Sequence, residues 1–397
     1  MDKFGEHRCE TPSLPNEAGI STSGVQIMAS MEEGVTGRYT DPPSGLQDHE
    51  KPGYRLCSHV DRFIDTPIGQ VPVIKSRVGK HDLLSTFLVR CGINRHQYKV
   101  APGLYGIGAP DKSSEVLVTA NFKLTFDHLR KELSGISAWI LVLETNGVNV
   151  WCAAGKGTFS TRELVKRIRI SALEKIVDHK RVIVPQLGAT GVSARKVKNQ
   201  SGFKVVYGPV RAEDIPAFLK NGGQADKTMR QVTFPMYERF ILTPVEIGIA
   251  LKPALLTALI LLVVSGFGPG VFSISNAWHR GAASVSALAS GMFSGLLVTP
   301  VLLPFVPSRI FAVKGIITGA VLAVPTLLLL SPALEGIAEF AALGIFCVCV
   351  SSFLSMNFTG TTPFTSPSGV EKEMKQFIPV QLTGLLISLG LWIYAAF

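Results

Sequence analysis

One segment of the chain gathers several residues that can do chemistry. It reads Asn149-Val-Trp-Cys-Ala-Ala-Gly-Lys156, with a thiol at Cys152 and an amine at Lys156. A cysteine beside a lysine and near a helix N-terminus can be held as a thiolate, which serves as a nucleophile or as a ligand to a soft metal. The competing interpretation is an inert buried thiol. A Cys–His hydrolase would need a base close by in space, for which His128 and His179 are the candidates.

Two common kinds of site fit this sequence poorly. The Gly-Lys pair of the segment suggests a phosphate loop, but that loop needs Gly five residues earlier and Ser or Thr directly after. Those positions hold Val150 and Gly157, so a nucleoside triphosphate site is not expected. No Cys-x-x-Cys occurs, which disfavours zinc ribbons and iron–sulfur clusters. Cys347 and Cys349 lie in an apolar segment, where a packing role is commoner than metal binding.

The elements that must position the segment follow an alternating pattern. Short Val/Ile/Leu-rich runs predict strands at 116–120, 138–143, 181–184 and 203–207. Amphipathic stretches between them predict helices at about 124–134, 160–178, 189–197 and 211–220. The second helix begins with a capping-box pair, Ser160 and Glu163. This alternation indicates an open α/β sheet, in which ligands bind outside the carboxyl ends of the strands.

Charge divides the chain into two parts. Residues 1–243 hold 57 charged residues, whereas residues 244–397 hold only 11. Five apolar stretches in the second part are long enough to cross a bilayer. They lie at about 247–267, 281–303, 310–330, 337–358 and 377–397. We therefore expect an all-α membrane domain, in which Lys252, Lys314 and Glu339 reach the headgroups from the ends of their spans.

The predicted organisation has four parts. Residues 1–55 read as a flexible N-terminal arm, 56–225 as the α/β domain, 226–245 as a juxtamembrane linker and 246–397 as the transmembrane domain. Residues 1–30 contain no apolar secretory segment, so we expect a multi-pass protein of the cytoplasmic (inner) membrane with its α/β domain in the cytoplasm. Basic residues at 227–239 favour membrane lipid as a partner. The other basic residues are spread through the α/β domain without forming a patch, so nucleic acid is not expected as a partner. Anchoring is favoured over transport because intramembrane ionisable residues are scarce.

The segment at 149–156 resembles the cap-helix motif of the mercury-methylating corrinoid proteins of the HgcA family. Residues 118–127, 184–189 and 207–211 also resemble that family, and they are similar to the corrinoid domain of the large subunit of the corrinoid iron–sulfur protein. The resemblance covers about 70–397. The five apolar stretches fit the mercury-methylating family and not the soluble relative.

The resemblance implies an open Rossmann-like domain that binds a cobalamin-type corrinoid. Cys152 would be the lower axial ligand of the cobalt, and thus both the catalytic and the metal-binding residue. The absence of a D-x-H-x-x-G motif fits a lower ligand other than histidine. The cofactor-binding residues implied by the resemblance are Asn149, Val150, Trp151, Ala153, Ala154, Gly155, Lys156, Thr119, Asn121, Gln186 and Gly188.

The implied activity is a corrinoid-dependent methyltransferase that passes a methyl group from cobalt to Hg(II), giving methylmercury. The chain has no cluster-binding run of its own, so a separate iron–sulfur electron donor is expected. The resemblance indicates a small ferredoxin-like protein, HgcB, and a folate methyltransferase as the methyl source. The alternative is a corrinoid methyl carrier of acetyl-CoA or one-carbon metabolism with a different acceptor.

Overall fold

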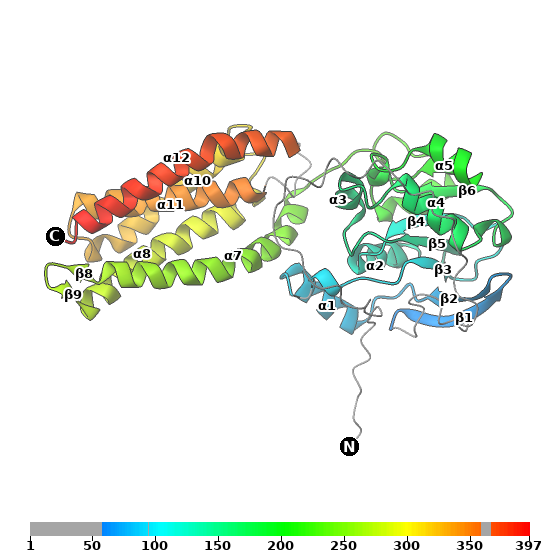
Figure 1. Cartoon of the computed structure of the whole chain (residues 1–397), viewed down its shortest axis with the longest axis horizontal. Helices are drawn as coiled ribbons and strands as arrows, with labels where there is room; N and C mark the ends of the chain where they lie inside the picture. Colours follow the sequence, from blue (N-terminus) through cyan, green and yellow to red (C-terminus); the bar gives the residue numbers. More distant parts are fainter. Residues whose placement is uncertain (1–57, 94, 359–366) are drawn as a thin grey trace, which may run out of the picture. The chain divides into compact units, whose positions relative to one another are not determined.

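The computed structural model describes residues 58–93, 95–358 and 367–397, which fall into two compact units (Figure 1). Unit 1 runs up to Leu84 and continues over His96–Gln231, and unit 2 comprises Ser85–Arg95 and Val232–Phe397. The arm predicted at 1–55 lies outside the described residues.

Unit 1 is built on a seven-stranded sheet with the order β1-β2-β3-β5-β4-β6-β7. The four predicted strands are present and parallel to one another. β3 pairs antiparallel with β5, and β1 forms an antiparallel hairpin with β2. The strands are β1 (Val60–Thr66), β2 (Gly69–Ile74), β3 (Gly103–Ile107), β4 (Val116–Ala120), β5 (Ala138–Leu143), β6 (Arg181–Val184) and β7 (Lys204–Tyr207).

Helices cover both faces of this sheet (Figure 1). Side chains alternate along a strand, so Val116 and Val118 of β4 join one core while Leu117 joins the other. The first core is closed by α3 (Val150–Gly155), α4 (Thr161–Ile170) and α5 (Ala194–Ser201). The second is closed by α2 (Lys123–Glu132) and α6 (Ile215–Lys220). Continuous apolar strands are what a sheet buried on both faces requires.

The helix predicted at 160–178 is shorter than expected. α4 ends at Ile170 because Ser171 turns its hydroxyl back onto the carbonyl of Arg167, and Ala172 adopts a left-handed conformation with φ 37°. The apolar residues beyond the break are still buried, including Leu173 and Ile176. The residues predicted to be apolar and buried are therefore buried, although the helix ends before the last of them.

Two other helix boundaries differ for local reasons. The stretch predicted as helix from 189 contains a loop, and α5 begins only at Ala194, where the Ser193 hydroxyl accepts a hydrogen bond from the backbone of Lys196. The stretch from 211 begins as a 3-10 turn, Ala212–Asp214, before α6.

The sequence reasoning missed the first four elements of unit 1. β1 is largely exposed and polar, the buried part of β2 is short and interrupted by Pro72, and β3 contains two glycines, so none shows the long apolar run that marks the buried strands. Helix α1 (Lys80–Arg90) was missed because its apolar residues are mostly exposed.

Among its described residues, unit 2 contains five helices that are long and apolar enough to cross a membrane. The candidate spans are Met236–Ser265, Ile274–Val301, Phe311–Ala333, Ile337–Asn357 and Gly369–Tyr394. The helices are α7 (Met236–Ser265), α8 (Ile274–Phe293) with a π-helical segment (Ser294–Val298) and α9 (Thr299–Val301), α10 (Phe311–Leu330), α11 (Ile337–Asn357) and α12 (Pro367–Tyr394). The first, second and last begin earlier than predicted, because polar first turns precede their apolar stretches.

Small residues let α11 pack closely between α8 and α10. A Cβ on Gly291 would lie 2.8 Å from the Cys347 carbonyl oxygen, and one on Gly315 would lie 2.7 Å from the Ser351 carbonyl oxygen. Glycines spaced four apart, such as Gly315 and Gly319, are typical of close helix packing in membranes.

Of the three charged residues expected to reach the headgroups, Lys314 and Glu339 are buried, so the expectation is wrong for these two. Lys314 donates hydrogen bonds to the carbonyls of Leu303 and Val306, at the turn after α9. Glu339 pairs with Arg280 at 2.9 Å. Each buried charge is therefore satisfied inside the bundle, as burial requires.

Candidate functional site

The predicted site segments meet at one edge of the sheet in unit 1. Because β4, β5, β6 and β7 are parallel, the turns after them emerge at the same edge. The segment at 149–156 follows β5, and most of it forms the short helix α3. The structure thus brings the 149–156 segment to the edge where ligands of open α/β sheets bind.

Cys152 lies in the first turn of α3. The Asn149 side chain caps the helix, accepting a hydrogen bond from the backbone N–H of Cys152 at 2.9 Å. The Cys152 side chain is half-buried. No group of three or more His, Cys, Asp or Glu that could hold a metal ion occurs in the described residues. A metal bound at Cys152 would therefore take its other ligands from a cofactor or a partner.

Helix α3 has one buried and one exposed face. Val150, Ala153 and Ala154 are at most 6% exposed and belong to the first core. Trp151 is 37% exposed, and Gly155 and Lys156 are also exposed. The two alanines thus let the helix pack onto the sheet, whereas Trp151, Gly155 and Lys156 face outward.

A tight contact fixes α3 against the turn after β6. A Cβ on Gly188 would lie 2.5 Å from the ring of Phe159. One on Gly191 would lie 2.1 Å from the Phe159 carbonyl oxygen and 3.2 Å from the Cα of Ala154. Only glycine fits at these two positions. By contrast, a Cβ on Gly155 would meet nothing within 4 Å, so the outer surface of α3 is open.

Asn121 holds the loop that leads into α3. Its Oδ1 accepts hydrogen bonds from the backbone N–H groups of Thr145 and Gly147, at 3.1 and 2.9 Å. Its Nδ2 donates to the Glu144 carboxylate at 2.7 Å. Asn121 is 1% exposed, so both ends of the amide are used inside the protein. The structure therefore gives Asn121 a positioning role, and Thr119, 2% exposed, is also buried.

One buried polar atom near this edge has no partner. The Gln186 side-chain oxygen makes no hydrogen bond within the described part of the chain. A short 3-10 turn after β6 begins at Gln186 and ends at Gly188. The Gln186 backbone N–H donates a hydrogen bond to the Pro209 carbonyl. An unpaired buried acceptor is costly unless a ligand or water donates to it.

The Cys–His and phosphate-loop alternatives do not fit the geometry. His179 precedes β6 and hydrogen-bonds through Nε2 to the Ser114 carbonyl, before β4, so it lies at the opposite edge from Cys152. His128 is exposed on α2, which covers the other face of the sheet. Lys156 is the C-cap of α3, whereas a phosphate loop leads into a helix N-terminus.

A cavity of about 310 Å³ lies at that opposite edge too. Its lining includes Arg62, Lys75, Gly108 and Gly135, next to the start of β5, and none of the predicted site residues. It therefore does not belong to the site around Cys152.

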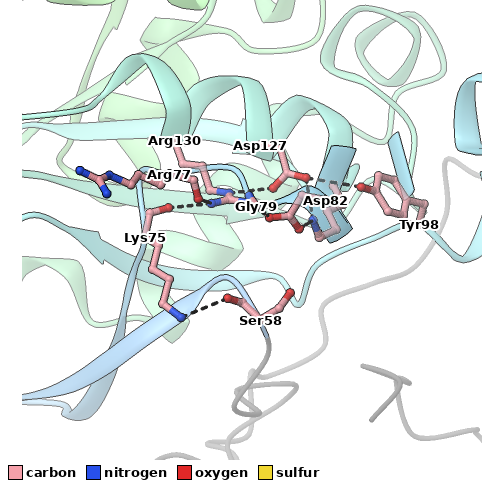
Figure 2. A network of polar contacts seen from close by, with 9 residues as sticks. Ser58, Lys75, Arg77, Gly79, Asp82, Tyr98, Asp127 and Arg130 are labelled. Atoms are coloured by element: carbon pink, nitrogen blue, oxygen red, sulfur yellow. Dashed lines mark hydrogen bonds and ion pairs between the residues drawn. The ribbon is translucent and has the colours of Figure 1, made fainter. Parts of the chain in front are cut away.

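The sequence reasoning also missed a buried group of charges (Figure 2). Arg130, fully buried, pairs with Asp82 at 2.8 Å and Asp127 at 2.7 Å, and Lys123 pairs with the same two carboxylates. Lys123, Asp127 and Arg130 are spaced four and three apart on α2, a pattern that could have indicated their shared face. This group pins the first turn of α1 to α2 within unit 1.

This group of buried charges shifts the pKa values of Asp82 and of the neighbouring His59. Burial alone would raise the pKa of Asp82, but the hydrogen bond and charge of Lys123, helped by Gly79 and Arg130, lower it to about 2. Burial, followed by the charge of Lys123, lowers the pKa of His59 to about 4. His59 packs against the rings of Tyr105 and Phe126.

Comparison with known proteins matches the α/β part of the chain. A family model described as the CO dehydrogenase/acetyl-CoA synthase delta subunit matches residues 68–219. The acetyl-CoA decarbonylase/synthase complex subunit gamma of Methanopyrus kandleri is 33% identical over 131 residues, which cover 32% of this chain and 28% of the relative. The same subunit of Archaeoglobus fulgidus is 30% identical over 157 residues, 38% of this chain and 33% of the relative.

A third relative bears directly on the expected cofactor. The corrinoid/iron–sulfur protein large subunit of Moorella thermoacetica is 32% identical over 124 residues, covering 31% of this chain and 27% of the relative. The similarity to this subunit expected from the sequence is confirmed. The chain spans about a third or less of each of these relatives, and the family match ends before the first apolar helix. Residues 68–219 are thus similar to corrinoid-related proteins of acetyl-CoA chemistry.

Proposed function

We propose that unit 1 carries a cobalamin-type corrinoid and that the chain is a membrane-anchored corrinoid methyltransferase. The observation that carries the proposal is the position of Cys152. Cys152 is half-buried in the first turn of α3, and this helix follows β5 at the carboxyl edge of the sheet. It also lies within the residues that are similar to corrinoid-related proteins. When bound, a corrinoid supplies a cobalt centre that carries and releases a methyl group.

The residues at this edge fit such a group. The open surface over Gly155 leaves room for a flat macrocycle, and Cys152 offers a soft thiolate as the lower axial ligand. The unpaired oxygen of Gln186 can accept a hydrogen bond from a corrinoid amide. Trp151 and Lys156 can border the macrocycle from the exposed face of α3.

Other residues of the proposed site support α3 from the protein side instead of facing the ligand. Asn149 caps the helix at Cys152, Asn121 holds the loop before it, and Gly188 allows α3 to seat against Phe159. Val150, Ala153, Ala154 and Thr119 are buried and shape the floor of the site. This division follows the burial of each residue. The proposed domains remain those expected from the sequence, with the cofactor-binding domain at 56–225, joined by 226–245 to the membrane domain at 246–397.

We propose Hg(II) as the methyl acceptor, giving methylmercury. The five apolar helices support the resemblance to the membrane-bound mercury-methylating family, and a soft electrophile would suit a methyl group on a cobalt that Cys152 would hold through its thiolate. The proposed partners are a small ferredoxin-like protein, HgcB, as electron donor, a folate methyltransferase as methyl source, and membrane lipid around unit 2. The proposed location is the cytoplasmic membrane, with unit 1 in the cytoplasm.

The relatives favour a second acceptor class. The proteins similar to residues 68–219 are subunits of acetyl-CoA decarbonylase/synthase complexes and a corrinoid/iron–sulfur protein, which supports a methyl carrier of acetyl-CoA or one-carbon metabolism. Both functions use the same site and differ only in the acceptor.

An acceptor assay tests the proposal. The full-length chain, purified in detergent and loaded with methylcobalamin, is mixed anaerobically with Hg(II), and methylmercury is measured. We expect wild type and Cys91→Ala to form methylmercury and Cys152→Ala to form none. Cys91 is a matched control because it is also a half-buried free thiol that can bind mercury.

The outcomes separate the two functions. Methylmercury at equal rates from Cys152→Ala and wild type would overturn the role of Cys152. A wild-type chain that binds corrinoid but leaves Hg(II) unmethylated would instead support the one-carbon carrier.

A further inference from the structure

Helix α1 has an apolar face that the described part of the chain leaves exposed. Leu83 is 60% exposed, Leu84 59%, Phe87 61% and Leu88 37%. These positions follow the i, i+1, i+4, i+5 spacing that places side chains on one side of a helix. The opposite side holds the buried residues Asp82 and Val89. A solvent-exposed row of this kind on a short helix calls for an apolar partner.

The charge around this row is basic. Lys80 and Arg90 stand at the two ends of α1. Asp82, the one acidic residue of the helix, points away and is neutralised by Lys123 and Arg130 at 2.9 and 2.8 Å. The exposed face of α1 therefore combines bulky apolar side chains with flanking cations, as in helices that lie in the interface of anionic bilayers.

The end of α1 contacts α7 near Gly248. A Cβ on Gly248 of α7 would lie 2.4 Å from the Cys91 carbonyl oxygen, so the chain leaving α1 touches the α7 backbone there. Gly92 lies beside Val245. Lys252, exposed, is the last charged residue of α7 before its uninterrupted apolar stretch. At about 1.5 Å per residue, Gly248 lies about 6 Å from the level of Lys252 along the helix.

Within unit 2, an exposed apolar surface runs from the second half of α1, which holds Phe87 and Leu88, onto α7. Ile93 follows α1 and is 49% exposed, and α7 carries exposed apolar residues on both sides of the contact, including Phe240 at 52% and Ile249 at 67%. Beyond Lys252 the exposed residues of α7, such as Leu255 and Ile260, belong to a candidate membrane span. The row on α1 thus adjoins a surface that lipid would cover.

We propose that α1 is an interfacial helix whose row Leu83, Leu84, Phe87 and Leu88 inserts into the headgroup–acyl boundary of an anionic bilayer. The proposal rests on unit 2 spanning that bilayer and does not depend on the corrinoid. It assigns the membrane a second contact with the chain, outside the five candidate spans.

Photo-cross-linking in a bilayer tests this directly. Phe87 is replaced by p-benzoylphenylalanine in the full-length chain, which is reconstituted into vesicles of phosphatidylcholine and phosphatidylglycerol, irradiated and analysed by mass spectrometry. Ile260 on α7 gives the lipid-facing reference. Ile170 is the matched control, because it is 48% exposed and lies on α4, which packs on the opposite face of the sheet from α2, the helix that is ion-paired to α1.

We expect lipid adducts at positions 87 and 260, with a yield on the order of tenfold above that at position 170. Adducts at 260 with only the position-170 background at 87 would overturn the interfacial helix while leaving the spans intact. Adducts from 87 to another protein would overturn it in favour of a protein partner. An absence of lipid adducts at 260 would remove the membrane assignment on which the proposal rests. Monodisperse gel filtration of each variant shows that the substitution is tolerated.

Discussion

At the residue scale, the structure separates side chains that the motif alone treats alike. The eight residues at 149–156 are contiguous in sequence, yet Ala153 and Ala154 face the core while Trp151 and Lys156 face outward. Cys152 could be singled out from residue types and spacing, whereas its helix was expected only from the resemblance to a cap-helix motif. Which neighbours support the helix and which can touch a ligand depends on its rotation against the sheet, which the six residues of α3 are too few to reveal by periodicity.

A pair of glycine substitutions tests the open face of α3. Gly155→Ala adds a methyl group that meets nothing within 4 Å, and alanine favours helix by about 1 kcal/mol, so stability should hold or rise. Corrinoid affinity should nevertheless fall, because the methyl group would occupy the proposed ligand surface. Gly188→Ala should lower stability instead, through its clash with Phe159. Thermal unfolding and cobalamin titration measure both effects. Unchanged affinity in Gly155→Ala would argue that the ligand does not lie over α3.

The role of Asn121 can be tested against an exposed asparagine. Asn121→Leu leaves the buried N–H groups of Thr145 and Gly147 unpaired, and each loss costs about 1–3 kcal/mol. Asn199→Leu, on the exposed side of α5, should change stability by less than about 0.5 kcal/mol. Denaturant unfolding of the full-length chain in detergent compares them. Equal stability of the two variants would show that Asn121 does not hold the loop.

The buried His59 predicts a pH dependence of stability. Its pKa is about 4 in the folded chain against 6.5 in the unfolded chain, so only the unfolded chain takes up the proton between these values. Stability should fall as pH drops from 6.5 to about 4, by about 3 kcal/mol in total. Asp82, with its pKa of about 2, changes the pH dependence of stability only below this window. His59→Leu should flatten the curve of unfolding midpoint against pH over this window, and an unchanged slope would contradict the assignment.

At the element scale, the predictable parts are those with a strong local signal. The four parallel strands β4 to β7 and the Ser160 cap were predicted correctly, because these strands carry continuous apolar runs and a helix start needs a capping side chain. The capping box is only half formed: Ser160 accepts from the Glu163 backbone, but the Glu163 carboxylate pairs with Arg167 and with the Glu144 N–H. Tertiary contacts of this kind are not encoded in local spacing.

The ion-pair group that fixes α1 to α2 gives a prediction at this scale. Arg130→Met would leave Asp82 and Asp127 buried with only Lys123 as a shared cation, which should cost about 3–5 kcal/mol. Lys131→Met, one residue along, removes a side chain that is 64% exposed and should change little. Comparison of the unfolding midpoints measures the difference. A loss below about 1 kcal/mol in Arg130→Met would show that the group is not a structural pin.

At the scale of the whole molecule, the uneven charge corresponds to two compact units of different composition. Unit 1 contains the segment similar to corrinoid-related subunits, and unit 2 contains the five helices that are apolar enough to span a membrane. Cys347 and Cys349 do not form a two-thiol site. Cys347 contacts Ser290 and the Gly319 carbonyl, whereas the Cys349 sulfur lies beside Gly384 on α12. Residues two apart on a helix point in different directions, which the sequence already implies.

The central claim is that this chain holds a cobalt corrinoid through Cys152, and one measurement tests it most directly. The full-length protein is produced with cobalamin, purified in detergent, and analysed for cobalt per chain and for its visible spectrum, beside Cys152→Ala and the control Cys91→Ala. The account predicts one cobalt per wild-type or Cys91→Ala chain. For Cys152→Ala it predicts either lost cobalt or a visible spectrum shifted by the missing thiolate. A wild-type chain without cobalt, or Cys152→Ala with full cobalt and an unchanged spectrum, would contradict it.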